Sequence, residues 1–172
     1  MRKQKRENGL HKLLQDREVG SLEYYRSVKH RQILEMLPRD ASDWLTKAIG
    51  DLVHNKVEEL NLESNNICGY QVVQYPSKAM AEALKVNTAL QVLSVRHHHI
   101  SDEGGKALAG ALKVNTALQE LNLYKNKISD EGAKALAEAL KVNTALQVLS
   151  LSRNNVSDAV KQQIKTDKRI EF

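Results

Sequence analysis

A pattern of apolar and polar positions recurs every 28 residues through the second half of the chain. In the central copy, Leu118, Leu121 and Leu123 are followed by Asn126 and Ile128, which gives the spacing L-x-x-L-x-L-x-x-N-x-I. The alternation around Leu121 and Leu123 predicts a short strand. The residues that follow, SDEGAKALAEAL, carry small and apolar side chains at helical spacing. Each period therefore predicts a strand, a loop, a helix and a second loop.

Particular residues are expected to start, pack and end the helix of the central copy. Ser129 and Asp130 are good N-cap residues, and Asn143 stands where a left-handed residue would end the helix. The apolar face of the helix comprises Ala135, Leu136, Ala139 and Leu140. The buried set of a unit is expected to be Leu108, Leu112, Val114, Leu118, Leu121, Leu123 and Ile128. One unit alone buries too little apolar surface to offset its ordering entropy, so the copies must stack.

An earlier, diverged copy of the strand pattern runs from Val57 to Ile67 and is separated from the next copy by five extra residues. The excess falls in the segment 68–78, CGYQVVQYPSK, which is predicted to be a loop carrying Tyr70, Val72, Val73 and Tyr75. The sequence leaves open whether this insertion packs against the stack or is presented to a partner.

The ends of the stack need caps. A helix is predicted from Leu22 to Leu37, closed by Pro38, with a buried stripe of Leu22, Tyr25, Ile33 and Met36. A second helix is predicted from Asp43 to Val53, with Trp44, Ala48, Ile49 and Leu52 toward the first strand. At the other end, Ile170 and Phe172 are expected to seal the last layer. We divide the chain into a basic tail with an N-terminal helical cap (1–41) and a repeat domain (42–172) of a half-unit, four strand-bearing units and a C-terminal cap.

These units resemble the leucine-rich repeat family, specifically its ribonuclease-inhibitor-like class. The SDEGAKALAEAL phrase is also similar to repeats that follow the nucleotide-binding module of NOD-like receptors and to those of Ran GTPase-activating protein. The resemblance covers roughly Ser42 to the carboxyl terminus. It implies an α/β leucine-rich repeat solenoid, a horseshoe segment with parallel strands on the concave side and helices on the convex side.

Side chains in a strand alternate between the core and the opposite face, so the residues between the core leucines are expected to point outward on the concave side. Together with adjacent strand ends, the candidate partner-binding residues are Glu59, Asn61, Glu63, Val92, Ser94, Arg96, Glu120, Asn122, Tyr124, Lys125, Val148, Ser150, Ser152 and Arg153. Tyr124 with Lys125 and Arg153 forms the best anchor, because Tyr and Arg often dominate interface energetics. Three glutamates oppose Arg96, which argues against a groove that tracks nucleic-acid phosphates.

Composition and charge narrow the functional classes. The chain has 172 residues and 41% apolar content, enough for one domain, and its few aromatic residues disfavour base-stacking modules. The lone Cys68 and the absence of a long apolar stretch lead us to expect an intracellular, cytoplasmic protein without a membrane span. The net charge is +5, and its excess includes Arg2, Lys3, Lys5 and Arg6. These form either a solvated tail, a nuclear import signal, or a weak contact to nucleic acid or acidic lipid.

Potentially reactive residues do not form a catalytic or metal-binding pattern. His98 aligns with Asn65, Asn126 and Asn154, while His97 and His99 replace Lys125 and Lys127. The resemblance implies that the aligned Asn bonds turn backbone, which an imidazole can partly do. Adjacent histidines on a strand end point apart and disfavour a closed tetrahedral site. We therefore expect no metal site, although adventitious nickel or zinc binding stays open.

Nucleotide binding and acid–base catalysis are not expected either. Gly104, Gly105 and Lys106 lack the remaining residues of a phosphate loop, and Asp102 and Asp130 are better interpreted as helix starts than as an acid and base pair. The leading hypothesis is a non-enzymatic scaffold that binds a partner protein without a cofactor. The alternative is a GTPase-activating or GTPase-regulating protein similar to the Ran regulator, although no residue here matches that family's activity.

Overall fold

The computed structural model describes residues 22–37, 43–62 and 74–172. The predicted basic tail, Glu63 and residues 68–73 of the insertion lie outside the described residues. The elements are, in chain order, α2 (Leu22–Leu34), α3 (Asp43–Val53), β1 (Glu59–Asn61), α4 (Gln74–Val86), β2 (Val92–Ser94), α5 (Asp102–Leu112), β3 (Glu120–Asn122), α6 (Asp130–Leu140), β4 (Val148–Ser150), α7 (Asp158–Ile164) and β5 (Ile170–Glu171).

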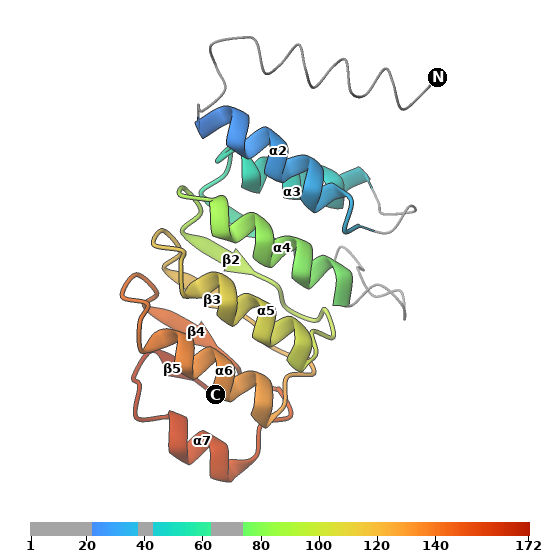
Figure 1. Cartoon of the computed structure of the whole chain (residues 1–172). Helices are drawn as coiled ribbons and strands as arrows, with labels where there is room; N and C mark the ends of the chain where they lie inside the picture. The colour runs from blue at the N-terminus through green and yellow to red at the C-terminus, as the bar shows by residue number, and fades with distance from the viewer. Residues whose placement is uncertain (1–21, 38–42, 63–73) are drawn as a thin grey trace.

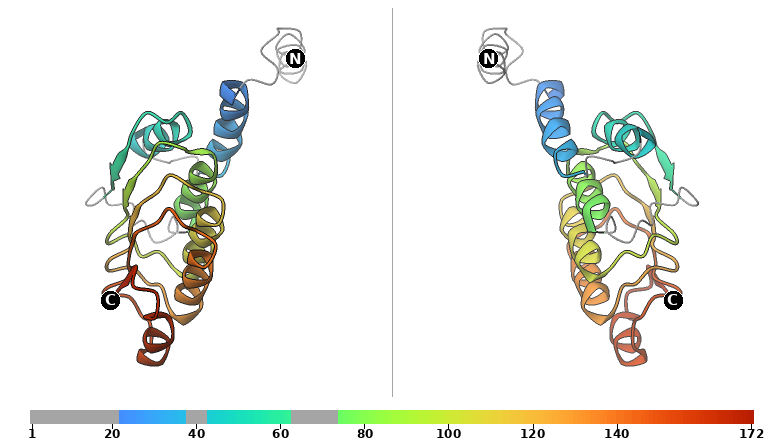
Figure 2. Two further views of the ribbon diagram at one scale, coloured as in Figure 1. Left: turned by 90° about the vertical axis from the view of Figure 1, so that its left-hand side faces the viewer. Right: turned by 90° about the vertical axis from the view of Figure 1, so that its right-hand side faces the viewer.

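The strands form one parallel sheet in the order β1-β2-β3-β4-β5. Their central residues are aligned across the sheet, with Leu60 opposite Leu93, Leu93 opposite Leu121, Leu121 opposite Leu149 and Leu149 opposite Ile170. Helices α4, α5 and α6 form a second layer on the other side of the leucine core (Figures 1 and 2). This arrangement confirms the α/β solenoid with strands and helices on opposite sides.

A column of buried asparagines connects successive units just before each strand. The Nδ2 of Asn115 donates to Leu84 O at 2.7 Å and Asn87 O at 2.9 Å, while its Oδ1 accepts from the backbone N–H groups of Ala117 and Leu118. Asn143 makes the equivalent four bonds one unit later. The expectation of a left-handed Asn143 is wrong, since the non-glycine residues with positive φ lie elsewhere. Asn143 serves the loop through its side chain instead.

Arg169 ends this column at the carboxyl end of the stack. Its Nη2 donates to Leu140 O and its Nη1 to Asn143 O, both at 2.7 Å. These carbonyls are the counterparts, 28 residues on, of the Leu112 and Asn115 carbonyls that Asn143 satisfies. The Asp167 carboxylate accepts from Arg169 Nε at 2.9 Å and holds the guanidinium in place. A charged side chain thus replaces the missing asparagine of a further repeat.

The predicted caps and core are confirmed in part. Ile33 is buried, but Tyr25 is 50% exposed and α2 ends at Leu34, three residues before the predicted end. Ile170 is buried and paired in β5, whereas Phe172 is exposed and does not seal the layer. Ala48, Ile49 and Leu52 are buried as expected, and the side chains of Leu22 and Trp44 lie outside the described residues.

Two further expectations are wrong because loop and helix boundaries differ from those predicted. Val114 follows the C-cap Lys113 of α5, and its side chain is 58% exposed rather than in the core. The predicted loop 68–78 ends early, since α4 begins at Gln74 and includes Tyr75. Ser77 in the first turns of α4 is buried, so the end of the insertion belongs to the packed helical layer.

Candidate functional site: the sheet face

The candidate binding residues form aligned rows across the sheet. Glu59, Val92, Glu120 and Val148 occupy one row, and Asn61, Ser94, Asn122 and Ser150 occupy the next. All of these side chains are partly or fully exposed, unlike the buried leucines Leu93, Leu121 and Leu149 between the rows. Neighbouring strands lie about 4.8 Å apart, so adjacent side chains of one row can contact the same ligand. We call this surface, with Arg96, Tyr124, Lys125, Ser152 and Arg153 at the strand ends, the sheet face.

Arg96 and Tyr124 form a contact at the carboxyl ends of β2 and β3. The guanidinium Cζ of Arg96 lies 4.9 Å from the centroid of the Tyr124 ring, within the range of a cation–π interaction. The His97 ring lies 5.7 Å from the same ring. Tyr124 therefore contacts two side chains of the preceding unit before any partner binds.

The residues that follow the strands share an unusual backbone conformation. His97, Lys125 and Arg153 have φ values of 63°, 54° and 60° and occupy the same position in three successive units. The backbone N–H of His97 donates to Tyr124 O at 3.1 Å, and that of Lys125 to Ser152 O at 2.9 Å. These bonds extend the backbone pairing of neighbouring strands into the turns that follow them. Positive φ is uncommon outside glycine, so a specific turn is repeated here with basic side chains.

The residues of the predicted anchor, Tyr124, Lys125 and Arg153, follow the carboxyl ends of β3 and β4, and Lys125 and Arg153 are exposed. The sequence interpretation missed His97 as a neighbour of Tyr124. Its alignment with Lys125 and Arg153 at the repeat spacing was the available signal. The two ends of the strands carry opposite charge. Glu59 and Glu120 lie at the amino ends of β1 and β3, and the basic residues follow the carboxyl ends of the strands.

His98 points away from this edge into the stack. Its Nε2 lies 2.8 Å from Leu62 O, and because a carbonyl only accepts, Nε2 carries the hydrogen. Burial lowers the pKa of His98, the bond to Leu62 opposes this shift, and the neighbouring His97 and His99 lower it further. Asn126 and Asn154 make the same kind of bond, to Val95 O and Leu123 O. The predicted structural role of His98 is confirmed.

Asp102 and Asp130 link helices of successive units. Asp102 Oδ1 accepts from the backbone N–H groups of Ser129 at 2.8 Å and Gly132 at 2.9 Å, and Oδ2 accepts from the Ser129 hydroxyl. Asp130 accepts from Ser157 in the same manner. Burial raises the pKa of Asp102, but the hydrogen bonds from Ser129 and Gly132 outweigh it and hold this pKa below its usual value.

These carboxylates do start helices, as expected. Asp102 also caps α6 through the N–H of Gly132, whereas Asp130 bonds Ser157, whose own hydroxyl accepts from Val160 N and caps α7. The expected side-chain cap by Ser129 is not formed, because its hydroxyl bonds Asp102 instead. The described residues contain no group of three His, Cys, Asp or Glu side chains placed to hold a metal ion. No helix in the described ranges is long and apolar enough to cross a membrane.

Comparison with known proteins agrees with this geometry. Residues 86–109, 114–137 and 142–159 match the family model described as Leucine Rich repeat. The fold is a leucine-rich repeat solenoid. A solved structure described as "Leiomodin-1 Actin-Binding Site 2 (ABS2)" is similar, with a TM-score of 0.63 and 22% sequence identity over 73% of each chain. At this identity the similarity supports the fold of the solenoid. A search of curated proteins found no match to the chain.

Proposed function

We propose that this leucine-rich repeat solenoid is a non-enzymatic scaffold that binds a partner protein through its sheet face. The observation that carries the proposal is the preassembled contact of Arg96 with Tyr124, flanked by Lys125 and Arg153 on a registered sheet. Tyr and Arg are enriched among residues that dominate binding energy. A side chain that is already held in place loses little entropy on binding, so a modest number of contacts suffices.

The division of the chain, the repeat class and the location belong to the same proposal. Helix α2 packs against α3 and α4, which supports its role as a cap within residues 1–41 on a repeat domain of residues 42–172. Helices α5 and α6 each have 11 residues, and such full helices support the ribonuclease-inhibitor-like class. The lone Cys68 is compatible with work in the cytoplasm.

Affinity capture with the full chain tests the sheet face. The variant combines Arg96→Glu, Glu120→Lys, Tyr124→Ala and Arg153→Glu, and its matched control changes exposed residues away from the sheet, Lys113→Glu, Val114→Ala and Val142→Ala. We expect the variant to lose specific partners that the wild type and the control both retain. Identical sets of captured proteins for all three would reject the sheet face as the binding surface.

Actin is the first defined partner to test, because the similar solved structure is described as an actin-binding site. Purified chain is mixed with monomeric and filamentous actin, and binding is followed by co-sedimentation and by fluorescence anisotropy. Binding that Tyr124→Ala weakens, with Val142→Ala unchanged, would identify actin as a sheet-face partner. Accelerated GTP hydrolysis by a small GTPase in the presence of the chain would instead support the alternative regulator function.

A further inference from the structure

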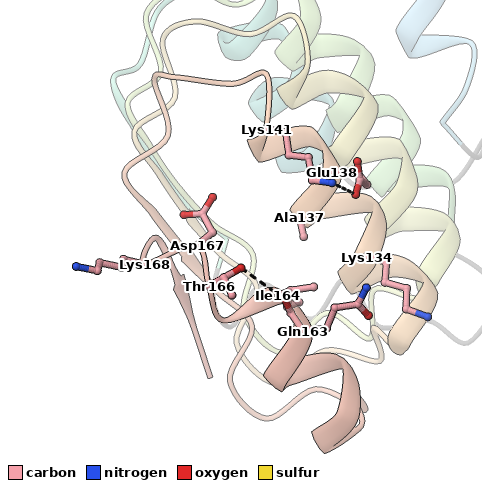
Figure 3. Close-up of a pocket in the computed structure, with 9 residues that line it drawn as sticks. All are labelled: Lys134, Ala137, Glu138, Lys141, Gln163, Ile164, Thr166, Asp167 and Lys168. Atoms are coloured by element: carbon pink, nitrogen blue, oxygen red, sulfur yellow. Dashed lines mark hydrogen bonds and ion pairs between the residues drawn. The ribbon is translucent and has the colours of Figure 1, made fainter.

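A second surface lies on the helical side of the solenoid, at its carboxyl end. Helix α6 and the segment that ends α7 border a groove of about 470 Å³ (Figure 3). Its lining residues are Lys134, Ala137 and Glu138 on α6, the C-cap residue Lys141, and Gln163, Ile164, Thr166, Asp167 and Lys168 on the opposite side. Helix α7 has only seven residues and packs less extensively on α6 than α6 packs on α5. The groove therefore lies where the row of long helices stops.

The wall that α6 contributes repeats a surface that is covered elsewhere in the stack. Lys134, Ala137 and Lys141 stand 28 residues after the corresponding Lys, Ala and Lys of α5. The equivalent alanines of α4 and α5, Ala81 and Ala109, are 2% and 3% exposed, but Ala137 is only partly buried. A full-length helix follows α4 and α5 in the row, and a short helix follows α6. Helix α6 thus leaves exposed the face on which its predecessors receive a helix.

The helix that covers α5 is α6, DEGAKALAEAL, and its buried residues are small or apolar. Its Asp130 and Glu138 do not face α5, since Asp130 bonds Ser157 of the next unit and Glu138 lines the groove. The packing of an occupant therefore follows from α6, and its charge follows from the groove. The open groove is bordered by Lys134, Lys141 and Lys168. The two acids of the groove are already engaged, Glu138 by Lys141 and Asp167 by Arg169, so Lys134 and Lys168 are the groove cations available to a ligand of opposite charge.

We propose that this groove binds an acidic helix of a partner protein. The small side chains of the helix pack on Ala137 and Ile164, and its carboxylates face Lys134 and Lys168. Charge complementarity of this kind favours the correct partner and speeds its association. The site is separate from the sheet face and does not depend on the function proposed above.

A second copy of this chain is a poor occupant of the groove. Helix α2, at the other end of the stack, carries Arg26, Lys29 and Arg31 against a single acid, Glu23. End-to-end stacking would bring these cations toward the lysines of the groove. The net charge of +5 opposes self-association in the same way.

The probe is an acetylated and amidated peptide with the sequence of residues 129–143, SDEGAKALAEALKVN, titrated into the ¹⁵N-labelled full chain. Saturable shifts are expected at Ala137, Lys141 and residues 163–168, with β2, β3 and β4 unaffected. The matched probe, SNQGAKALAQALKVN, replaces the three acids by amides. We expect it to bind at least fivefold more weakly, and we expect 0.5 M salt to weaken the acidic probe.

Variants of the chain locate the site independently. The charge reversals Lys134→Glu and Lys168→Glu should each weaken the acidic probe severalfold, whereas Lys127→Glu, an exposed change in a loop, should not. If a variant fails to fold, as judged by circular dichroism, the comparison of the two probes on the wild type still decides. Equal binding of both probes, shifts confined to the sheet face, or no saturable shift at millimolar peptide would overturn the proposal. A dimer detected by sedimentation velocity and abolished by Ala137→Arg would assign the groove to a second copy and also overturn it.

Discussion

The carboxylate of Asp102 lies in the first turn of α5 but accepts the backbone N–H of Ser129, at the start of α6, at 2.8 Å. The helix dipole and the unpaired N–H groups of a first turn make this a favourable place for negative charge. Asp102 therefore supplies the N-terminal cap of the following unit, and neighbouring helices are joined by polar bonds as well as by apolar packing.

Replacing Asp102 by Ala is expected to lower the free energy of unfolding by about 1–2 kcal/mol, because the first turn of α6 loses its capping acceptor. The Asp102→Asn variant should recover part of the loss, since an amide oxygen can still accept from Ser129 and Gly132. Urea titration of the two variants measures the difference. Equal stability of Asp102→Ala and the wild type would show that the cap contributes nothing.

Protonation of the Asp102 carboxylate is expected to lower the stability of the fold in acid. The pKa of Asp102 in the folded state is below its usual value near 3.8. Its stabilisation is therefore complete above pH 4 and is lost as the pH falls through the folded pKa. The Asp102→Ala variant should lose less stability than the wild type between pH 4 and pH 2, as measured by thermal unfolding.

Replacement of Gly132 in α6 and of Gly110 in α5 by alanine is expected to change the free energy of unfolding in opposite directions. A Cβ on Gly132 would lie 2.6 Å from Asp102 Oδ1 and 2.8 Å from Ile128 Cγ2, whereas a Cβ on Gly110 would meet no atom within 4 Å. Gly132→Ala should destabilise the chain by about 1–3 kcal/mol through this clash. Gly110→Ala should stabilise it by about 0.5–1 kcal/mol, because alanine loses less backbone entropy. Chemical denaturation of both variants tests the pair, and effects of the same sign would contradict the described packing.

The strict spacing of the leucines explains why so much of this fold could be predicted. Leu93, Leu121 and Leu149 recur at one interval, so their alignment in a parallel sheet and the outward orientation of the residues beside them follow directly. The contact of Arg96 with Tyr124 could not be predicted with the same detail, because it depends on side-chain conformations across two strands.

Other features were missed because they depend on groups that are distant in sequence or on where a helix ends. The N-terminus of α6 is capped by Asp102 of the preceding unit and not by the hydroxyl of Ser129, which bonds Asp102 instead. The sequence around Ser129 does not indicate this contact, because Asp102 is 27 residues away. Val114 has the composition of a core residue but follows the end of α5, which turns its side chain toward solvent. The groove beside α6 exists because α7 is short, and Gln163, Lys165 and Asp167 in place of the alanines of a full helix were the available sign.

The buried asparagine column is expected to contribute more to stability than the exposed residues around it. Asn115→Ala removes a side chain that satisfies two carbonyls and two N–H groups of adjacent loops. Each buried group left unsatisfied costs about 1–3 kcal/mol, so the total loss should exceed about 2 kcal/mol. Thr116→Ala, at the exposed neighbouring position, should change stability by less than about 0.5 kcal/mol. Denaturant titration measures both, and similar losses would argue against the column.

His98 gives the stack a pH dependence that an asparagine at the same position would not. Its pKa in the folded state is below the usual value of 6.5, chiefly because of burial. The unfolded chain therefore binds a proton more readily, and stability falls as the pH drops from about 7 toward the folded pKa. His98→Asn should flatten this part of the profile while its amide still reaches Leu62 O. Thermal unfolding from pH 8 to pH 5 measures the slope.

A second histidine, partly buried, also contributes to the pH dependence of stability. His30 packs against His54 between α2 and α3, and burial, followed by the charges of His54 and Lys56, lowers the pKa of His30. A reduced but nonzero slope is therefore expected for His98→Asn. The reciprocal change Asn126→His, one unit later, should steepen the slope, because it buries a second imidazole in the same kind of position. If His98→Asn and the wild type lose stability in parallel from pH 7 to pH 5, protonation of His98 is not coupled to unfolding of the stack.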